Sequence, residues 1–240
     1  HGRLPEDLQA KGLDEAVAEA SEWARTDCVV ALQAGDRLEG DAFDELVSRV
    51  ARYTGLERSF VERHRGRITV PQFCRELLRD EGRTVGRLDS RFEGLGRSST
   101  TDYPFDPSLA AITPPYTQML NDYVRREIGY ETDLEYEVLS GKVSGEWEWE
   151  RKKHEDTSES LRIAFAANPH MRVLVAQGRY DLATPFDGID YTLNHMELDP
   201  AVRGNITTKH YEGGHMLYID VAQLAMLKAD VAEFLASTGG

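Results

Sequence analysis

Two side chains near the C-terminal end of the sequence have residue types and a spacing that suit acid–base chemistry. Asp181 lies in the stretch Gly178–Pro185, and His215 lies in the glycine-rich turn Gly213–Met216. A serine hydroxyl becomes a good nucleophile when an imidazole takes its proton, and that imidazole needs a carboxylate to fix its tautomer and stabilise its charged form. We therefore predict that Asp181 and His215 are catalytic, as the carboxylate and the base of a triad.

Each of these stretches follows a predicted strand. The apolar run Val173–Ala176 is typical of a strand that is buried on both faces, and Ile206–Tyr211 is predicted to be a second strand. In open α/β sheets the working residues lie just beyond the carboxyl ends of the strands. An aspartate after one strand and a histidine after the next is the arrangement found in α/β-hydrolases.

Helices alternate with these strands from residue 157 onward. Residues 161–167 are predicted to form a short helix, and Thr184–Asp187 to begin a second one. Asp220 is predicted to begin the last helix in a capping box with Gln223. The residues of that helix expected to point inward are Leu224, Leu227, Val231, Phe234 and Leu235. This is half of a doubly wound sheet, and since two parallel strands alone make a poor sheet, we expect the other strands to lie outside this chain.

The first two thirds of the sequence read as helices and loops. Apolar residues recur at steps of three and four over 12–33 and again over 42–53. Gly35 is predicted to end the first helix, and Asp41 to cap the second.

Capping residues and prolines predict where the helices of residues 69–156 begin. Thr69–Gln72 is predicted to form a capping box before a third helix. Residues 82–113 are predicted to form loops, and 129–156 irregular structure. Thr113-Pro114 is predicted to begin another helix, because proline is favoured in the first helical turn.

The charge and hydropathy of the sequence argue against two classes of partner, nucleic acids and membranes. The 240 residues carry a net charge of −14, which repels phosphate and argues against a nucleic-acid partner. No apolar run is long enough to cross a bilayer, so no membrane partner is expected. Arginines over 49–97 are interleaved with acids, which predicts a salt-bridged helical surface. The sequence shows no signal peptide and opens on His1 without a methionine, so we expect that translation did not begin there.

Neither a metal nor a cofactor is expected. Cys28 and Cys74 are predicted to be buried free thiols on helical faces, with a disulfide between two helices as the alternative in an exported protein. No Cys/His spacing predicts a zinc site. His210 and His215 lack a neighbouring carboxylate or cysteine that would complete a ligand set.

At these residues the chain resembles the serine carboxypeptidase family of α/β-hydrolases. The loop ending in Asp181 is similar to the family's Gly-Asp-x-Asp loop, with Arg179 in place of its first aspartate. The turn Gly213–Met216 closely matches the family's histidine turn. The resemblance implies hydrolysis of the C-terminal bond of a peptide substrate through an acyl-enzyme. It also implies that Met216 helps to line the leaving-group pocket, with a core methionine as the alternative.

The family's architecture implies a partial α/β-hydrolase fold. Residues 1–156 would be a helical lid inserted into the core, and residues 157–240 the C-terminal part of that core. His1–Leu4 resembles the continuation of the family's strand that leads into the lid. The family's nucleophile lies in a Gly-x-Ser-x-Gly elbow, and the nearest stretch here, Gly96–Thr100, lacks the closing glycine. We therefore expect the serine on a missing or separate N-terminal segment of the same protein. The resemblance also implies a secreted or periplasmic location.

Two other interpretations stay open. Another lidded α/β-hydrolase, a proline iminopeptidase or an esterase, would share the Asp181 loop, although the turn Gly213–Met216 favours the carboxypeptidase. A non-catalytic helical binding module would have to cover its sheet edge with its own residues or in a homodimer. The apolar run Val173–Ala176 argues against that module, because an uncovered edge of such a strand invites aggregation.

Overall fold

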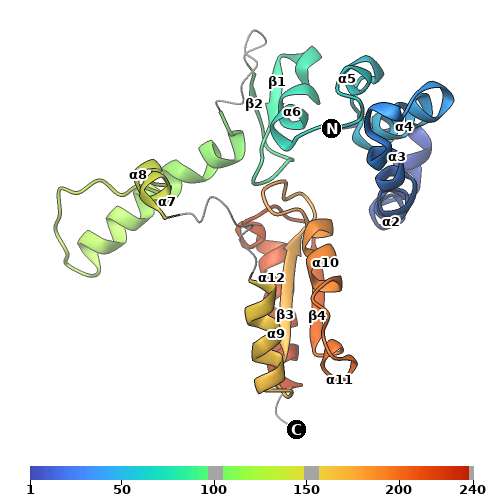
Figure 1. The fold of residues 1–240 in the computed structure, drawn as a ribbon. Coiled ribbons are helices and arrows are strands. Elements are labelled where there is room, and N and C mark those ends of the chain that lie inside the picture. The colour runs from blue at the N-terminus through green and yellow to red at the C-terminus, as the bar shows by residue number, and fades with distance from the viewer. Residues whose placement is uncertain (97–104, 149–156, 238–240) are drawn as a thin grey trace. The chain divides into compact units, whose positions relative to one another are not determined.

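The computed structural model describes residues 1–96, 105–148 and 157–237. The chain is mixed α/β and mainly helical, with two small two-stranded sheets in this described part, one antiparallel and one parallel (Figure 1). It divides into two compact units, His1–Asp106 and Pro107–Gly240, which are described separately below.

The first unit consists of short helices and a hairpin. Its α-helices are α1 (Glu6–Ala10), α2 (Leu13–Trp23), α3 (Val29–Ala34), α4 (Gly40–Thr54), α5 (Arg58–Arg63) and α6 (Val70–Glu76). A π-turn, Ala24–Cys28, joins α2 to α3, so the helix predicted over 12–33 is formed with a bulge and ends at Gly35. Short 3-10 turns cover Gly35–Arg37 and Arg79–Glu81. Buried side chains of α4, α5 and α6 form its core with β1: Leu46, Val47, Val50, Phe60, Val61, Cys74 and Val85.

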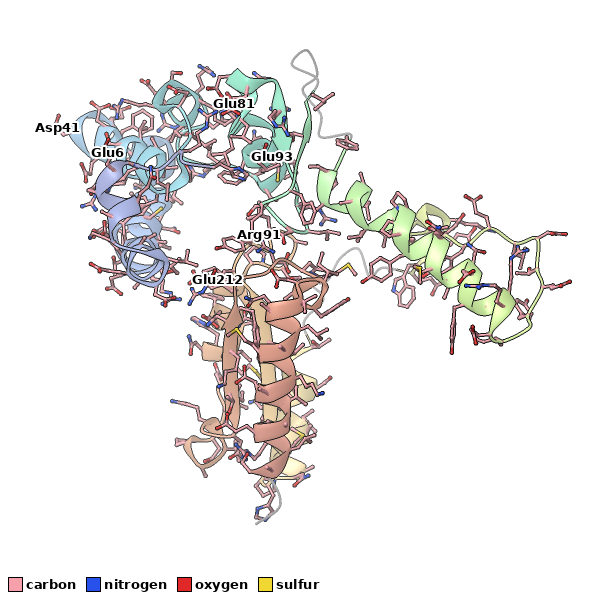
Figure 2. All side chains as sticks on the ribbon, turned by 180° about the vertical axis from the view of Figure 1, so that it is seen from behind. Glu6, Asp41, Glu81, Arg91, Glu93 and Glu212 are labelled. Atoms are coloured by element: carbon pink, nitrogen blue, oxygen red, sulfur yellow. The ribbon has the colours of Figure 1, made fainter. Side chains whose placement is uncertain are left out.

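The start of α4 differs from the prediction. Its N-cap is Glu39 rather than Asp41, and no side chain caps it. Gly40, with a φ of 58°, turns the chain into the helix, which places Asp41 inside the first turn. The exposed carboxylate of Asp41 (Figure 2) stabilises the helix there, because it interacts favourably with the positive end of the helix dipole. The capping box at Thr69 and Gln72 is confirmed.

The stretch predicted as loop over 82–113 contains more structure than expected. It holds the antiparallel hairpin β1 (Arg83–Val85) and β2 (Glu93–Leu95), and the start of α7. Thr84 is buried in this hairpin, and its hydroxyl donates to the carbonyl of Cys74 at 3.0 Å. Three-residue strands are too short to show an alternation in the sequence, which explains why the pattern did not reveal them.

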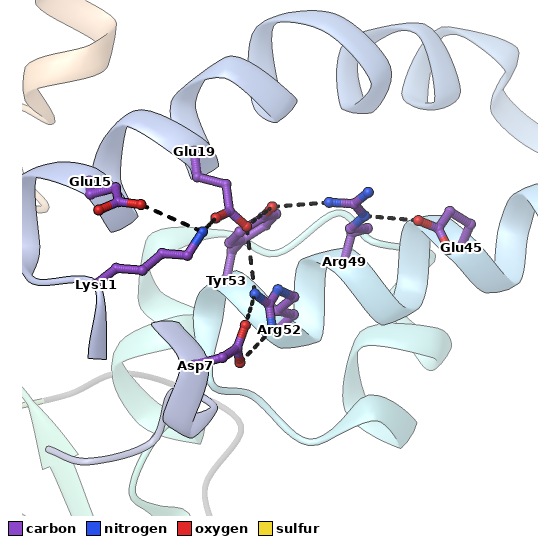
Figure 3. Close-up of polar contacts among 8 residues, drawn as sticks. All are labelled: Asp7, Lys11, Glu15, Glu19, Glu45, Arg49, Arg52 and Tyr53. Atoms are coloured by element: carbon purple, nitrogen blue, oxygen red, sulfur yellow. Dashed lines mark hydrogen bonds and ion pairs between the residues drawn. The ribbon is translucent and has the colours of Figure 1, made fainter. Parts of the chain in front are cut away.

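The arginines of this unit form the salt-bridged surface that their spacing predicted (Figure 3). Arg52 on α4 pairs with Asp7 on α1 and lies 3.6 Å from Glu19 on α2. Lys11 also pairs with Glu19. These contacts join three helices, although exposed ion pairs of this kind each contribute only about 0–1 kcal/mol to stability.

The two cysteines and the N-terminal residues 1–4 of the first unit can be compared with the predictions. Cys28 and Cys74 form no disulfide; Cys74 is buried and Cys28 half-buried, and burial raises the pKa of the Cys28 thiol. His1–Leu4 is not a strand, contrary to the family resemblance. The His1 ring and Arg3 instead bind acidic side chains, Nδ1 of His1 lying 2.8 Å from Glu93 Oε1.

The second unit has six α-helices and a parallel sheet among its described residues. They are α7 (Pro107–Arg126), α8 (Gly141–Glu146), α9 (Ser158–Ala167), β3 (Val173–Gly178), α10 (Phe186–Asn194), α11 (Pro200–Arg203), β4 (Ile206–Tyr211) and α12 (Val221–Ala236). The helix expected from Thr113-Pro114 starts earlier, at Pro107, and Pro114 and Pro115 lie inside it. Pro107 takes the first-turn place, and the two inner prolines leave two helical hydrogen bonds unmade. The short helix α8 interrupts the stretch predicted as irregular.

Strands β3 and β4 pair in parallel, with Val173 opposite Ile206 and Gly178 opposite Tyr211. Side chains alternate across the sheet. Val173 and Ile206 therefore face α9, α10 and α11, in a cluster with the buried Phe165, Met196, Leu198 and Val202. Tyr211 faces the opposite side, where its hydroxyl binds α12. Helices therefore lie on both faces of the two strands (Figure 1).

The burial predicted for this sheet is only partly present. Residues 173–175 of β3 are half-buried and Ala176 is exposed, so the strand is not buried on both faces. On α12, Leu227 and Phe234 are half-buried, while the other three residues predicted to point inward are exposed: Leu224 46%, Val231 37% and Leu235 62%. A two-stranded sheet is too narrow to cover a helix face. Asp220 does cap α12, but Gln223 accepts a hydrogen bond from the Glu212 N–H instead of closing a capping box.

Asp230 on α12 provides the polar link between this helix and β4. Its carboxylate accepts from the hydroxyl of Tyr211 at 2.7 Å and lies 2.9 Å from Lys209 Nζ. Tyr211 is only 1% exposed, and burial together with the neighbouring carboxylate raises its pKa.

Replacing Asp230 by alanine leaves the buried Tyr211 hydroxyl without its acceptor. We expect the free energy of unfolding to fall by about 1–3 kcal/mol, the cost of an unsatisfied buried polar group. Urea denaturation of the variant checks this. Asp230→Asn keeps a carbonyl acceptor and should lose less; equal losses in both variants would assign the effect to the charge rather than to the hydrogen bond.

Candidate active site

The predicted catalytic residues lie on two adjacent loops of the second unit. The first loop leaves β3 after Gly178, and the second leaves β4 after Tyr211. The N–H of Arg179 donates to the Tyr211 carbonyl at 3.0 Å, and the N–H of Tyr180 donates to the Gly213 carbonyl at 2.9 Å. These backbone bonds continue the strand pairing into the loops and hold them side by side.

Gly178 allows this close approach. A Cβ atom at this position would lie 2.2 Å from the Gly214 carbonyl oxygen and 2.5 Å from that of Gly213. Gly213 is equally restricted, because its Cβ would lie 2.7 Å from the Cβ of Leu217. Gly213 and Gly178 serve here by giving space, since neither has a positive φ.

The Asp181 carboxylate is buried, with 5% of the residue exposed, and it accepts four hydrogen bonds. Oδ1 accepts from the backbone N–H groups of Ala183 at 2.7 Å and Thr184 at 3.0 Å. Oδ2 accepts from the Thr184 hydroxyl at 2.5 Å, and lies 2.8 Å from Nδ1 of His215. The loop therefore fixes the carboxylate in one orientation.

Two opposing effects act on the pKa of Asp181. Burial is the largest single effect and raises the pKa, because it penalises the charged form. The hydrogen bonds from Thr184, His215 and Ala183 stabilise the carboxylate and together outweigh burial, so the pKa lies below its usual value. Asp181 is consequently ionised at neutral pH and can hold an imidazole N–H.

His215 is placed as a base would require. Nδ1 faces Asp181 at 2.8 Å, while the side chain is 45% exposed. With a carboxylate as its partner, Nδ1 carries the proton, and the lone pair on Nε2 is free to accept one. The hydrogen-bonding contact predicted between the two residues is thus present. Sequence reasoning missed Thr184, although a hydroxyl three residues after the aspartate was visible as a signal.

The other residues singled out in the sequence lie around this pair. Met216 follows His215 directly and is half-buried, outside the core cluster of α9 to α11. The Arg179 guanidinium lies 6.0 Å from the ring centre of Phe186, which contacts His210 edge-on. Nε2 of His210 lies 3.8 Å from Asp190 Oδ2, so this histidine packs against two side chains of α10.

No group of three or more His, Cys, Asp or Glu side chains within residues 1–96, 105–148 and 157–237 is placed to hold a metal ion. No helix in the same ranges is long and apolar enough to cross a membrane. The stretch Gly96–Thr100, considered and rejected as a nucleophile elbow, lies almost entirely outside the described residues, as does the predicted domain boundary at residue 156.

Comparison with known proteins gives no relative. No family model, no curated protein and no solved structure matches the chain. The resemblance to serine carboxypeptidases therefore depends on the two loop motifs alone.

Proposed function

We propose that this chain supplies the aspartate and histidine of a serine-type hydrolase, together with the C-terminal part of an α/β-hydrolase core. The observation that carries the proposal is the contact of 2.8 Å between His215 Nδ1 and a buried Asp181 carboxylate, at the ends of two adjacent parallel strands. We further propose that residues 1–156 form a lid and that the protein is secreted or periplasmic.

The proposed reaction is hydrolysis of a C-terminal peptide bond without a cofactor. His215 Nε2 takes the proton of a serine hydroxyl, whose oxygen attacks the carbonyl carbon of the scissile bond. The imidazolium, stabilised by Asp181, gives that proton to the leaving amine, and an acyl-enzyme remains. His215 Nε2 then takes a proton from water, whose oxygen attacks the ester carbonyl, and gives that proton to the serine oxygen, which leaves as the shortened peptide is released.

The uncovered apolar surface of the second unit supports a separate segment that carries the serine. In the described residues β3 pairs with β4 alone, which leaves its other edge unpaired. Val221, Leu224 and Leu235 on α12 are 81%, 46% and 62% exposed. An unpaired strand edge invites pairing with another strand, and an exposed apolar helix face is typical of an interaction surface. We propose that the N-terminal segment of the same protein covers both, rather than a second copy of this chain.

The test is to isolate the chain after expression of its complete reading frame and to determine every polypeptide in the sample by intact mass spectrometry. A second polypeptide, or an N-terminal extension, with a Gly-x-Ser-x-Gly peptide labelled by a fluorophosphonate supports the proposal. Absence of any labelled serine in a sample that contains the entire reading frame would contradict it and would favour the binding module.

Substrate assays then separate the hydrolase classes. A carboxypeptidase releases the C-terminal residue of a blocked peptide. Release of an N-terminal proline would identify an iminopeptidase instead, and cleavage of a p-nitrophenyl ester without any peptide cleavage would identify an esterase. Loss of the peptide signal in the His215→Ala variant shows that the activity belongs to this chain.

A further inference from the structure

The Thr184 hydroxyl forms a third corner of the contact between Asp181 and His215. Its oxygen lies 2.5 Å from Asp181 Oδ2 and 3.3 Å from His215 Nδ1, while those two atoms lie 2.8 Å apart. The hydroxyl therefore contacts the acidic and the basic member of the pair at once.

The donors in this triangle can be assigned from the acceptors. An ionised carboxylate offers no proton, so the Thr184 hydroxyl donates to Oδ2. The lone pairs of that hydroxyl remain available to Nδ1 of His215, which then faces two oxygens. Only the tautomer with a proton on Nδ1 satisfies both oxygens. The other tautomer would direct a nitrogen lone pair at them.

The backbone holds Thr184 in this position. Its own N–H donates to Asp181 Oδ1, so the same residue binds both carboxylate oxygens. Pro185 follows directly, and a residue before proline is restricted to extended conformations. The β-branched side chain has few accessible rotamers. Thr184 itself is exposed, so replacing its side chain does not disturb the packing of a hydrophobic core.

We propose that Thr184 is a positioning residue, which orients the Asp181 carboxylate and selects the Nδ1-protonated tautomer of His215. Its effect on turnover depends on the hydrolase function proposed above, whereas its effect on the two side chains does not. Hydrogen bonds from Thr184 are also among the contacts that lower the pKa of Asp181. His215 is the titratable side chain that contacts this carboxylate in the described part of the chain.

The experiment uses the full chain labelled with ¹³C and ¹⁵N and compares Thr184→Val with the wild type by NMR. Valine keeps the shape and removes the hydroxyl. We expect the titration midpoint of the Asp181 carboxyl carbon to move to higher pH, because the charged form loses a donor. We also expect exchange of the His215 Nδ1 proton with water to become faster by about tenfold, the size expected for one hydrogen bond to a charged group.

Two further variants serve as controls. Thr184→Ser restores the hydroxyl and should return both readings toward the wild type. Thr192→Val removes an exposed threonine hydroxyl from α10 that binds only the Gly188 carbonyl, at 3.1 Å, and should leave both readings unchanged. If the valine variant fails to fold, Thr184→Ala gives the same comparison without a branched side chain.

Wild-type titration and wild-type exchange in a folded Thr184→Val or Thr184→Ala variant would overturn the proposal. A chain that shows the expected shifts but never yields a labelled serine would overturn the hydrolase function and leave the role of Thr184 intact. An active enzyme whose Thr184→Val variant shows wild-type titration and exchange would overturn the role of Thr184 and leave the hydrolase function intact.

Discussion

Replacement of His215 by alanine should lower kcat of the proposed hydrolase, assembled with its proposed serine segment, by about a thousandfold or more. Without the imidazole nothing takes the proton of the serine hydroxyl, and nothing returns a proton to the leaving amine. The carboxylate of Asp181 cannot replace it, because it is buried and already accepts hydrogen bonds from the Ala183 and Thr184 backbone. Fluorophosphonate labelling should fall with kcat.

His195→Ala is the matched control for this experiment. That histidine is exposed at the end of α10, where its Nδ1 lies 2.7 Å from the Tyr191 carbonyl and its ring stacks on Tyr191. Its loss should leave kcat unchanged. Equal kcat in His215→Ala and the wild type would refute the assignment of the base, whatever the fold of the assembled protein.

The second large effect is expected at Gly178, where alanine should both destabilise the chain and separate Asp181 from His215. The new Cβ would lie 2.2 Å from a backbone oxygen of Gly214, so no side-chain rotation can relieve the contact. The loop that carries His215 must move instead, which breaks the backbone bonds of Arg179 and Tyr180. We expect a loss of about 3 kcal/mol in the free energy of unfolding, at the upper end of overpacking costs.

Urea denaturation measures that loss, and the NMR signal of the His215 Nδ1 proton reports on the contact with Asp181. Gly188→Ala is the control, since that glycine is in helix α10 and a Cβ there meets open space. It should gain about 0.5–1 kcal/mol from higher helix propensity. An unchanged denaturation midpoint together with an unchanged proton signal in Gly178→Ala would show that the two loops are not in close contact.

Features encoded by a few neighbouring residues could be predicted from the sequence. Three such features are present in the structure: the bounds of β4, the Thr69 capping box and the Asp220 cap. Each depends on residues that are close together in the sequence. The contact of Asp181 with His215 could be predicted because parallel strands bring their carboxyl ends together.

Other features depend on contacts that the sequence does not display. The space required at Gly178 comes from a carbonyl 36 positions away, and no local pattern encodes it. Thr184 had a sequence signal in its place three residues after Asp181, but the contact of its hydroxyl depends on the rotamer of Asp181, which the sequence does not show. The exposure of Leu224 and Leu235 was also missed, since apolar periodicity shows which face is buried but not whether the covering element belongs to the same chain.

The acid–base pair is complete within residues 157–237, since both loops and the bonds that join them lie there. Proteolytic cleavage on the N-terminal side of α9 would therefore not separate Asp181 from His215. If the proposed serine lies on a preceding segment, a cleavage between it and residue 157 would leave the contact between Asp181 and His215 intact.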